Sequence, residues 1–372
     1  MHKAGLVITI LHVLETLAGH GGTPRKLLYL ARHIDRQQIR LVFAHFRPSP
    51  LAHEFIKSGC QVYAIHTESP LTLTWKIREI ARECGANVIC THFTRSLITG
   101  FVAAKWHQIP IIHNEHSSAH YRQGLGRALA RLVLPWVDLI ICNSEHTRQS
   151  IQKSFSGTKD KLVTIHNPVE ERIAGRSAEE VRAELGVAEN DILIIHVGRM
   201  IPERDQITIL EGVFELRKSF PSVQLVMIGE GPKRADLELS VRTMGLAGSV
   251  RFIGNSNQIG DYLEAADIYV NSTRDEGFGI AVVEAMLSKI PVVLSDCGAH
   301  PELIVSGKSG LLYEAGNSHA LAVQLGHLVG DPDLRRRMGV DGRKRALQRF
   351  SPAGYATRYL DSIKPRLIQR QS

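Results

Sequence analysis

The sequence is organised around Arg274-Asp275-Glu276-Gly277-Phe278-Gly279-Ile280-Ala281-Val282-Val283-Glu284. One apolar run, Ile268 to Ser272, precedes this stretch, and a second, Pro291 to Ser295, follows it. This order predicts a strand, a glycine-bearing loop, a short helix and another strand, which is the pattern of an α/β crossover. The loop is therefore expected at the carboxyl end of a strand, where ligands bind in open parallel sheets.

The composition of this loop favours a ligand site. Gly277 and Gly279 allow backbone angles that a side chain would forbid. The N–H groups from Phe278 to Ile280 would open a helix and attract negative charge. Glu276 in the loop and Glu284 about one turn inside the helix can then face one pocket.

The spacing of the two glutamates also fits an ordinary crossover with surface acids, because short motifs match by chance. Two glutamates eight positions apart behind a Gly-x-Gly loop resemble the Glu-x7-Glu signature of the retaining glycosyltransferases of family 4. The resemblance runs through most of the chain and is densest from His196 to Tyr313. It implies an α/β architecture of the GT-B type, with two Rossmann-like, doubly wound domains facing a deep interdomain cleft and a C-terminal helix that crosses back to the first domain.

Length and pattern independently predict two domains. A chain of 372 residues exceeds one ordinary core. Seven apolar runs alternate with helix-length segments in the first half, which predicts a doubly wound parallel sheet of about seven strands. The periodicity lapses at Asn167-Pro168-Val169-Glu170 and in the polar segment that follows. We expect an acceptor-side domain at 1–168, a donor domain at 169–349 and a returning helix at 350–372.

Two arginines follow the apolar run Ile192 to Val197. Arg199 comes after Gly198, and Arg204 follows Pro202-Glu203. Guanidinium groups at a strand end can bind a diphosphate through paired, charge-assisted hydrogen bonds, although surface arginine is the commoner explanation of Arg204 alone. The string resembles the family's Gly-Arg-x-x-x-x-Lys, which implies a phosphate-binding role for both residues, with arginine where lysine is usual.

Two further motifs resemble the nucleotide side of the family's donor site. Gly229-Glu230-Gly231-Pro232 is similar to its Gly-x-Gly-Pro loop. Val250 to Gly254, with Phe252 and Ile253, is similar to a short strand whose backbone meets the nucleobase. Ala299 stands where the family usually has the second of two glycines, close to the donor sugar.

The first half offers candidate residues of its own. Gly21 and Gly22 lie in a glycine loop that opens a helix, which is a tight turn or, by resemblance, a cleft loop near the donor diphosphate. The segment His113 to His120 holds three histidines and a glutamate, but a strand end that runs into a loop gives metal ligands no common face. A satisfied or solvent-facing histidine cluster is the better interpretation. By resemblance, His116 is the cleft histidine beside the donor sugar, and His92 and His113 are weaker candidates.

Charge and hydropathy limit the partners. The formal net charge of +8 and pI of about 9.3 favour acidic partners, but no nucleic-acid-binding motif is present. The helical segment 121–136 is basic and amphipathic, which fits a solvated face or contact with an anionic membrane. No run approaches the ~18–20 apolar residues of a membrane span. The apolar N-terminus resembles a signal peptide but is better interpreted as a first strand. Five cysteines without a Cys-x-x-Cys pair indicate buried thiols in a reducing compartment. We expect a cytoplasmic protein, with peripheral contact at the inner membrane face left open.

The resemblance implies a metal-independent, retaining glycosyltransferase. It would move a sugar from a nucleotide-diphosphate donor, with UDP the expected carrier, to a hydroxyl acceptor in cell-surface polysaccharide or lipid-linked glycan synthesis. Arg199, Arg204 and the helix start would receive the leaving diphosphate, Glu276 and His116 would hold the sugar, and Glu284 would hold the ribose. No cofactor is expected beyond the donor itself. Another GT-B enzyme, such as a nucleotide-sugar epimerase or hydrolase, and a non-catalytic GT-B scaffold are the alternatives.

Overall fold

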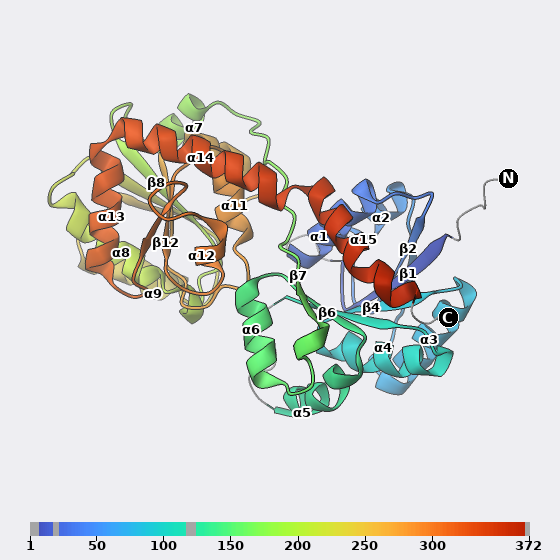
Figure 1. Ribbon diagram of the computed structural model, residues 1–372. Helices are drawn as coiled ribbons and strands as arrows, with labels where there is room; N and C mark the ends of the chain where they lie inside the picture. The colour runs from blue at the N-terminus through green and yellow to red at the C-terminus, as the bar shows by residue number, and fades with distance from the viewer. Residues whose placement is uncertain (1–6, 18–21, 117–123, 369–372) are drawn as a thin grey trace. The chain divides into compact units, whose positions relative to one another are not determined.

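The computed structural model describes residues 7–17, 22–116 and 124–368, and Figure 1 traces them as ribbons. The chain divides into two compact units. Unit 1 comprises Met1–Pro168 and Pro352–Ser372, and unit 2 comprises Val169–Ser351. Each unit is a Rossmann-like layer structure with a parallel sheet of its own, as expected for the GT-B fold.

Unit 1 is built on a sheet in the order β3-β2-β1-β4-β5-β6-β7, with every pairing parallel. Its strands are β1 (Ile8–Leu14), β2 (Ile39–His45), β3 (Gln61–Ala64), β4 (Val88–His92), β5 (Ile111–Glu115), β6 (Leu139–Cys142) and β7 (Leu162–Thr164). The strand order reverses between β1 and β4. The carboxyl ends of these two strands therefore form the topological switch point, where open sheets bind ligands.

Helices cover both faces of this sheet. They are α1 (Gly22–His33), α2 (Ala52–Lys57), α3 (Pro70–Glu83), α4 (Thr94–His107), α5 (Gly124–Val133), α6 (Glu145–Ser154), α15 (Pro352–Ile368) and the 3-10 turns η1 (Leu134–Trp136) and η2 (Lys159–Lys161). Burial on both faces explains why the central strands are apolar along their length rather than alternating. β1 lies in the middle of the sheet and is almost fully buried, which agrees with the first-strand interpretation of the apolar N-terminus.

The last helix, α15, belongs to unit 1 although the rest of that unit ends at Pro168. Tyr355, Tyr359 and Ile363 are fully buried in the same apolar cluster as residues of α1 and β1. The expected return of the C-terminal helix to the first domain is thus present, and Figure 1 shows α15 alongside α1.

Unit 2 contains a second parallel sheet in the order β10-β9-β8-β11-β12-β13. Its strands are β8 (Ile192–Val197), β9 (Val223–Ile228), β10 (Val250–Gly254), β11 (Ile268–Asn271), β12 (Val292–Ser295) and β13 (Leu311–Tyr313). Its helices are α7 (Ala178–Glu184), α8 (Gln206–Arg217), α9 (Arg234–Thr243), α10 (Ile259–Ala265), α11 (Ile280–Leu287), α12 (His300–Leu303), α13 (Ser318–Gly330), α14 (Pro332–Phe350) and the 3-10 turn η3 (Pro202–Arg204).

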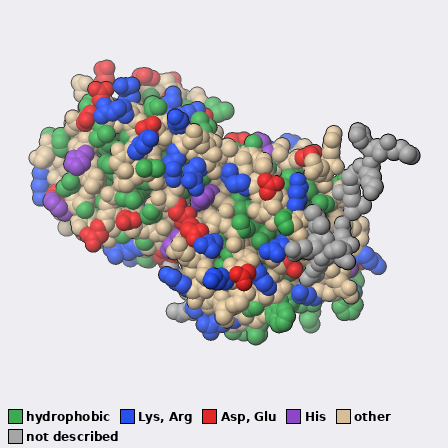
Figure 2. Space-filling model, viewed as in Figure 1, with side chains coloured by type: hydrophobic (Ala, Val, Ile, Leu, Met, Phe, Trp, Pro, Cys, Tyr) green, Lys and Arg blue, Asp and Glu red, His purple; other side chains and the backbone are tan. Residues whose placement is uncertain are grey.

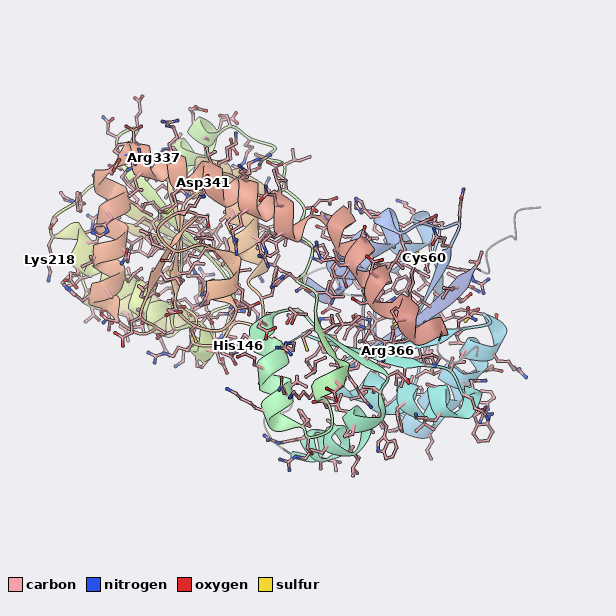
Figure 3. The ribbon with its side chains drawn as sticks, viewed as in Figure 1. Cys60, His146, Lys218, Arg337, Asp341 and Arg366 are labelled. Carbon is pink, nitrogen blue, oxygen red and sulfur yellow. The ribbon has the colours of Figure 1, made fainter. Side chains whose placement is uncertain are left out.

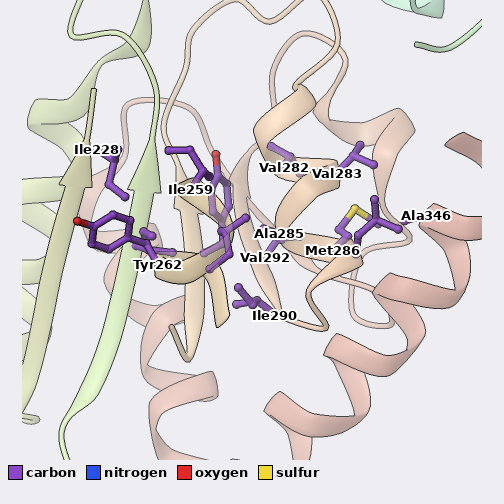
Figure 4. Packing of buried hydrophobic residues seen from close by; sticks show 14 of the residues in the cluster. Ile228, Ile259, Tyr262, Val282, Val283, Ala285, Met286, Ile290, Val292 and Ala346 are labelled. Atoms are coloured by element: carbon purple, nitrogen blue, oxygen red, sulfur yellow. The ribbon is translucent and has the colours of Figure 1, made fainter. Parts of the chain in front are cut away.

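The core of unit 2 holds α11 in place. Val282, Val283 and Met286 on α11 are fully buried, and Ala346 on α14 belongs to the same cluster, as Figure 4 shows. Phe278, just before α11, meets the ring of Phe350 edge-on at 5.5 Å between centroids. The apolar character of the helix after the Gly-x-Gly loop therefore has a packing cause, and the packing fixes where the loop sits.

The arginines of helix α14 differ in their surroundings. Arg337 is exposed (Figure 3). In contrast, Arg343 pairs with Glu171, and Arg345 donates to the carbonyls of Leu303 and Glu302 at 2.6 and 2.9 Å. These arginines attach α14 to neighbouring segments of unit 2. An arginine whose carbonyl partners are remote in sequence carries no local pattern that would reveal the contact.

Candidate active site

The β11–α11 loop of unit 2 is held by backbone contacts with the turn after β12. Ala299 N donates to Glu276 O at 2.9 Å, and Ser295 Oγ donates to Thr273 O at 2.7 Å. Gly298 has φ +60°, and a Cβ there would lie 2.5 Å from Glu276 N. Glycine is therefore required at position 298 for this close approach. The carboxylate of Glu276, which is almost fully buried, is fixed in place by this frame.

The second glutamate lies where the crossover pattern predicts. Gly279 has φ +94° and caps α11, and Glu284 follows in the second turn of that helix with its side chain buried. Its Oε1 accepts from Arg172 Nε at 2.7 Å. A buried carboxylate needs such a partner because desolvation of an isolated charge is expensive. The sequence did not reveal Arg172, which lies in the polar segment at the start of the expected donor domain.

Arg204 and Glu276 form a direct ion pair. Arg204 ends the short turn η3, and three bonds tie this turn to the loop after β11. Ser272 Oγ donates to Arg204 O at 2.8 Å, while Thr273 Oγ1 and Arg274 N donate to Glu203 O at 3.0 and 2.9 Å. The structure thus brings together two residues that are 72 positions apart in the sequence and that were predicted to serve one ligand.

The loops after β8, β9 and β10 are joined backbone to backbone. Gly198 N donates to Ile228 O at 2.9 Å, and Gly229 N donates to Gly254 O at 2.8 Å. Gly229 has φ +138°, and a Cβ there would lie 2.0 Å from Gly198 O. Gly231 meets Met200 in the same way. Arg199 stands between these contacts with an exposed side chain, and within the described part of the chain it has no ion-pair partner.

A buried tyrosine shows how closely the charged groups gather. Tyr269 on β11 donates to Val197 O at 3.3 Å. Burial raises the pKa of its hydroxyl, and the charges of Glu276, Arg204 and Glu284 all act on it as well. Because a Coulomb interaction weakens with distance, these effects agree with both carboxylates and Arg204 lying near the Tyr269 hydroxyl.

Two histidines complete the buried floor of this site. His196 on β8 is held through Nδ1 by Val270 O at 3.0 Å, and burial lowers its pKa to about 4. Burial lowers the pKa of His300 at the start of α12, and the charges of Glu276 and Arg204 also act on its imidazole. Both imidazoles are therefore neutral at pH 7, and they line the site as uncharged polar groups.

Phe252 and Ile253 occupy the sheet edge. β10 is an outer strand, and its register with β9 skips Ile253, because Phe252 pairs with Met227 and Gly254 with Ile228. Both side chains pack partly against the two apolar clusters. A ligand at this strand could therefore contact its backbone rather than its side chains. The family resemblance implies the same for the nucleobase.

In unit 1, His116 is brought together with residues that the sequence did not connect. His116 Nε2 lies 3.0 Å from His92 Nδ1, and His92 Nε2 lies 3.0 Å from His12 Nδ1. His116 Nδ1 lies 3.5 Å from Lys26 Nζ on α1. His92 was a weak candidate, but His12 and Lys26 lay inside apolar patterns and were missed.

The remaining candidate residues of unit 1 are Gly21, Gly22 and His113. Gly22 is the first residue of α1, and Gly21 lies outside the described residues. His113 belongs to β5 rather than to a loop and is buried against Thr91 at 2.9 Å, so it forms part of the sheet's packing. Over residues 7–17, 22–116 and 124–368, no group of three His, Cys, Asp or Glu side chains is arranged to hold a metal ion.

Two family models match the chain. The model described as Glycosyltransferase Family 4 covers residues 20–172, and the model described as Glycosyl transferases group 1 covers residues 177–345. Among curated relatives, the putative glycosyltransferase EpsD of Bacillus subtilis (strain 168) is 31% identical over 175 residues, which is 47% of this chain and 46% of that protein. The alpha-monoglucosyldiacylglycerol synthase of Streptococcus pneumoniae (strain ATCC BAA-255 / R6) is 26% identical over 280 residues, 70% of this chain and 63% of that protein.

The fold has close counterparts among solved structures. The crystal structure of Anabaena Alr3699/HepE in complex with UDP superposes with a TM-score of 0.84 at 21% identity, covering 97% of this chain and 100% of that one. At this identity the likeness supports the fold. Together with the two models, which between them cover both units, it supports one assignment. The chain belongs to the glycosyltransferase family that the group 1 and family 4 models describe.

Proposed function

We propose that this glycosyltransferase moves a sugar from a nucleoside diphosphate sugar, with UDP as the carrier, to a hydroxyl acceptor and retains the anomeric configuration. The observation that carries the proposal is the set of groups at the carboxyl ends of β8 and β11. The Arg204 guanidinium pairs there with the buried Glu276, and α11 begins nearby and carries the buried Glu284, which pairs with Arg172. Retention rests on the resemblance to family 4 enzymes.

The chemistry of the reaction explains why these groups belong together. Glycosyl transfer builds positive charge on the sugar and negative charge on the departing diphosphate. Cations and N–H groups that are already in place stabilise that negative charge more in the transition state than in the ground state. Arg199, with its exposed side chain, and Arg204 would receive the diphosphate together with the N–H groups that open α11.

The two carboxylates would orient the donor. Glu276 would accept hydrogen bonds from sugar hydroxyls, and its pair with Arg204 would hold the carboxylate in position. Glu284 would accept from the ribose hydroxyls through the carboxylate that Arg172 already holds. The outer edge of β10, with Ile253 at its bulge, would meet the base through the backbone. UDP is the carrier proposed because the Anabaena protein of the same fold was crystallised with UDP.

A transfer assay tests the donor site. We expect Arg199→Ala and Glu276→Gln to lower transfer by about 100-fold or more, because each removes a charge-assisted contact to the reacting groups. Arg337→Ala, which removes an exposed arginine on α14, is the matched control and should transfer normally. A thermal-shift screen against UDP, GDP and ADP identifies the carrier, because only a ligand of the folded state raises its stability.

Two results would redirect the proposal. Full transfer by both site variants would remove Arg199 and Glu276 from the mechanism. Donor consumption without an acceptor product would indicate an epimerase or a hydrolase instead. Metal independence has its own test, since transfer should survive exhaustive EDTA treatment.

We further propose that unit 1 contacts an anionic membrane and uses a lipid-linked acceptor. Among the described residues, none of the helices combines the length and apolar character of a transmembrane span. However, all three tryptophans of the chain lie in unit 1 and are half-exposed or more, Trp75 at 50%, Trp106 at 64% and Trp136 at 65%. Tryptophan beside basic residues is typical of membrane interfaces.

The surroundings of these tryptophans support that surface. The guanidinium of Arg78 on α3 stacks on the Trp106 ring of α4 at 3.8 Å. The helix α5 exposes Leu125 and Leu132, and Arg131 lies in its last turn. Figure 2 shows apolar side chains along the lower edge of this unit, over α4 and α5. The curated relative from S. pneumoniae is named as a synthase of a glucosyl diacylglycerol, a lipid product.

Vesicle sedimentation tests the membrane contact. We expect binding to vesicles with anionic lipid, weaker binding at high salt, and loss of binding in the double variant Trp75→Ser and Trp106→Ser. Leu239→Ser, an equally exposed apolar residue of unit 2, is the control and should bind normally. Equal partition of the wild-type protein with and without anionic vesicles would refute the contact. A cytoplasmic location is proposed as well, because the cysteines in the described residues are free thiols.

A further inference from the structure

Three imidazoles and one amine in unit 1 form a single file. The rings of His12 and His92 stack with centroids 5.4 Å apart, and those of His92 and His116 with centroids 5.3 Å apart. Hydrogen bonds of 3.0 Å join each neighbouring pair of rings, and Lys26 Nζ continues the file 3.5 Å beyond His116. Each member thus has its hydrogen bond on the side that faces the next member.

The file crosses the topological switch point of the sheet. His12 lies on β1, His92 ends β4, His116 follows β5, and Lys26 lies in the second turn of α1. His12, His92 and Lys26 are buried, whereas His116 is partly exposed. Both ends of the file, His12 and Lys26, are therefore buried, and His116 is the member that reaches solvent.

The His12 end of the file meets apolar and aromatic groups. Phe43 stacks on His12 at 5.1 Å between centroids, and Tyr359 of α15 lies on the same ring at 6.2 Å. His12 Nε2 is buried, and in the part of the chain that the structure describes it has no hydrogen-bond partner. The titratable groups around Lys26 are Glu115 on β5, Cys142 on β6, the three histidines, and Tyr355 on α15, whose ring lies 5.9 Å from Nζ.

A charged Lys26 fixes the direction of every bond in the file. An ammonium group donates and cannot accept. When Lys26 is charged, His116 must accept at Nδ1 and carry its hydrogen on Nε2, which it donates to His92. His92 must then donate from Nε2 to His12, and the last hydrogen sits on the unpartnered Nε2 of His12.

Loss of the proton from Lys26 allows this order to reverse. A neutral amine can accept, so His116 can place its hydrogen on Nδ1 and donate to Lys26. His92 then donates from Nδ1 to His116, and His12 donates from Nδ1 to His92. The His12 end is left with a bare ring nitrogen in an apolar setting instead of a buried N–H without a partner.

We propose that Lys26 is a positioning residue whose charge state selects the tautomers of His116, His92 and His12 as one set. Its effect on catalysis rests on the proposed function and on the family resemblance, which implies that His116 lies beside the donor sugar. The selection of tautomers itself does not depend on that assignment.

Both states of Lys26 are accessible near neutral pH. Burial lowers the pKa of Lys26 to about 7, with Cys142 and Glu115 opposing the shift. Burial also lowers the pKa of His12 to about 3 and that of His92 well below its usual value, so neither ring takes up the proton. Of these three groups, Lys26 is therefore the one that takes up or releases a proton near neutral pH.

Nitrogen NMR of the histidine rings tests the proposal directly, because a ring nitrogen that carries hydrogen and one that is bare give well-separated signals. With ¹⁵N-histidine in the full chain, we expect His12, His92 and His116 to carry hydrogen on Nε2 at pH 6 and to move together to Nδ1 by pH 8. Replacement of each histidine in turn assigns the signals. Histidine tautomers that stay constant across this range in the wild-type protein would overturn the proposal.

Two variants of Lys26 sharpen the test. Lys26→Met removes the charge and should give one fixed set of tautomers between pH 6 and pH 8. Lys26→Arg, which stays protonated, should hold the Nε2–H set throughout. Lys57→Met, a variant of an exposed lysine on α2, should behave like the wild type. If either Lys26 variant fails to fold, the wild-type titration alone decides.

Transfer kinetics add a readout that separates this inference from the proposed function. If transfer occurs, the wild type and Lys57→Met should show an inflection in kcat near pH 7 that Lys26→Met lacks. Tautomers that switch together in a protein without transfer activity would support the file and reject the proposed function. A retained inflection in Lys26→Met would reject a role of Lys26 in catalysis.

Discussion

Replacement of Lys26 by methionine should stabilise unit 1 at neutral pH. Lys26 is 2% exposed and lies among apolar and aromatic side chains, which disfavours its charged form. In the unfolded chain the amine is charged at pH 7, with a pKa of 10.5, whereas burial lowers the pKa to about 7 in the folded state. Folding at neutral pH must therefore either release a proton from Lys26 or bury the amine in its charged form.

The magnitude follows from this difference in proton affinity. A shift from 10.5 to about 7 lowers the unfolding free energy by about 4 kcal/mol at pH 7 and by only about 1 kcal/mol at pH 10. The penalty is complete below the folded pKa and fades as the pH rises to the unfolded pKa. Loss of the hydrogen bond to His116 in the variant offsets about 1 kcal/mol. We therefore expect Lys26→Met to be about 3 kcal/mol more stable at pH 7 and about equal to the wild type at pH 10.

Tryptophan fluorescence is a specific assay for this effect. Trp75, Trp106 and Trp136 all lie in unit 1, so urea unfolding followed by their emission reports the unit that contains Lys26. Lys57→Met, with an exposed amine, should leave the midpoint unchanged at both pH values. A Lys26→Met variant that is less stable than the wild type at pH 7, or a stability gain that persists undiminished at pH 10, would refute the reasoning.

Three further predictions concern unit 2. Gly229→Ala should lower its stability by about 3 kcal/mol or more, because the new Cβ would lie 2.0 Å from Gly198 O, whereas Gly248→Ala, which meets nothing within 4 Å, should be tolerated in the same thermal melt. The stability that neutral His196 contributes is present above pH 6.5, and the free energy of unfolding should fall by about 3 kcal/mol as the pH drops to its folded pKa of about 4. Hydrogen exchange in β8 should show this loss in the wild type and not in His196→Asn. Glu284→Gln should raise the KM for the donor about 10-fold with kcat nearly unchanged, because ribose contacts are equal in the ground and transition states, and a fall in kcat alone would contradict this.

The sequence revealed those parts of the candidate site whose positions follow from local backbone geometry. Gly279 begins α11 at positive φ, and Glu284 falls in the second turn, because the strand, loop and helix follow one another directly in the chain. Arg199 and Arg204 were recognisable because they follow the end of an apolar strand. Local order is enough when the neighbouring residues determine the geometry.

The parts that were missed depend on partners remote in sequence. Arg172 is an ordinary charged residue of a polar segment until the fold places it 2.7 Å from Glu284. Lys26 and His12 occupy positions whose apolar neighbours predict core packing, and only the sheet order β1-β4-β5 brings them next to His92 and His116. The available signal in the sequence was a polar residue among apolar neighbours, because burial of a polar side chain is costly unless it has a hydrogen-bonding partner.

The passage of α15 into unit 1 has a consequence for biosynthesis. On the ribosome, the first 168 residues emerge well before Tyr355 and Tyr359, which fill their core. At ordinary elongation speeds this delay is roughly 10 to 40 s. During that time the nascent first half exposes the apolar surface that the last helix will cover. We therefore expect deletion of α15 to destabilise unit 1, although this helix is translated long after the other elements of that unit.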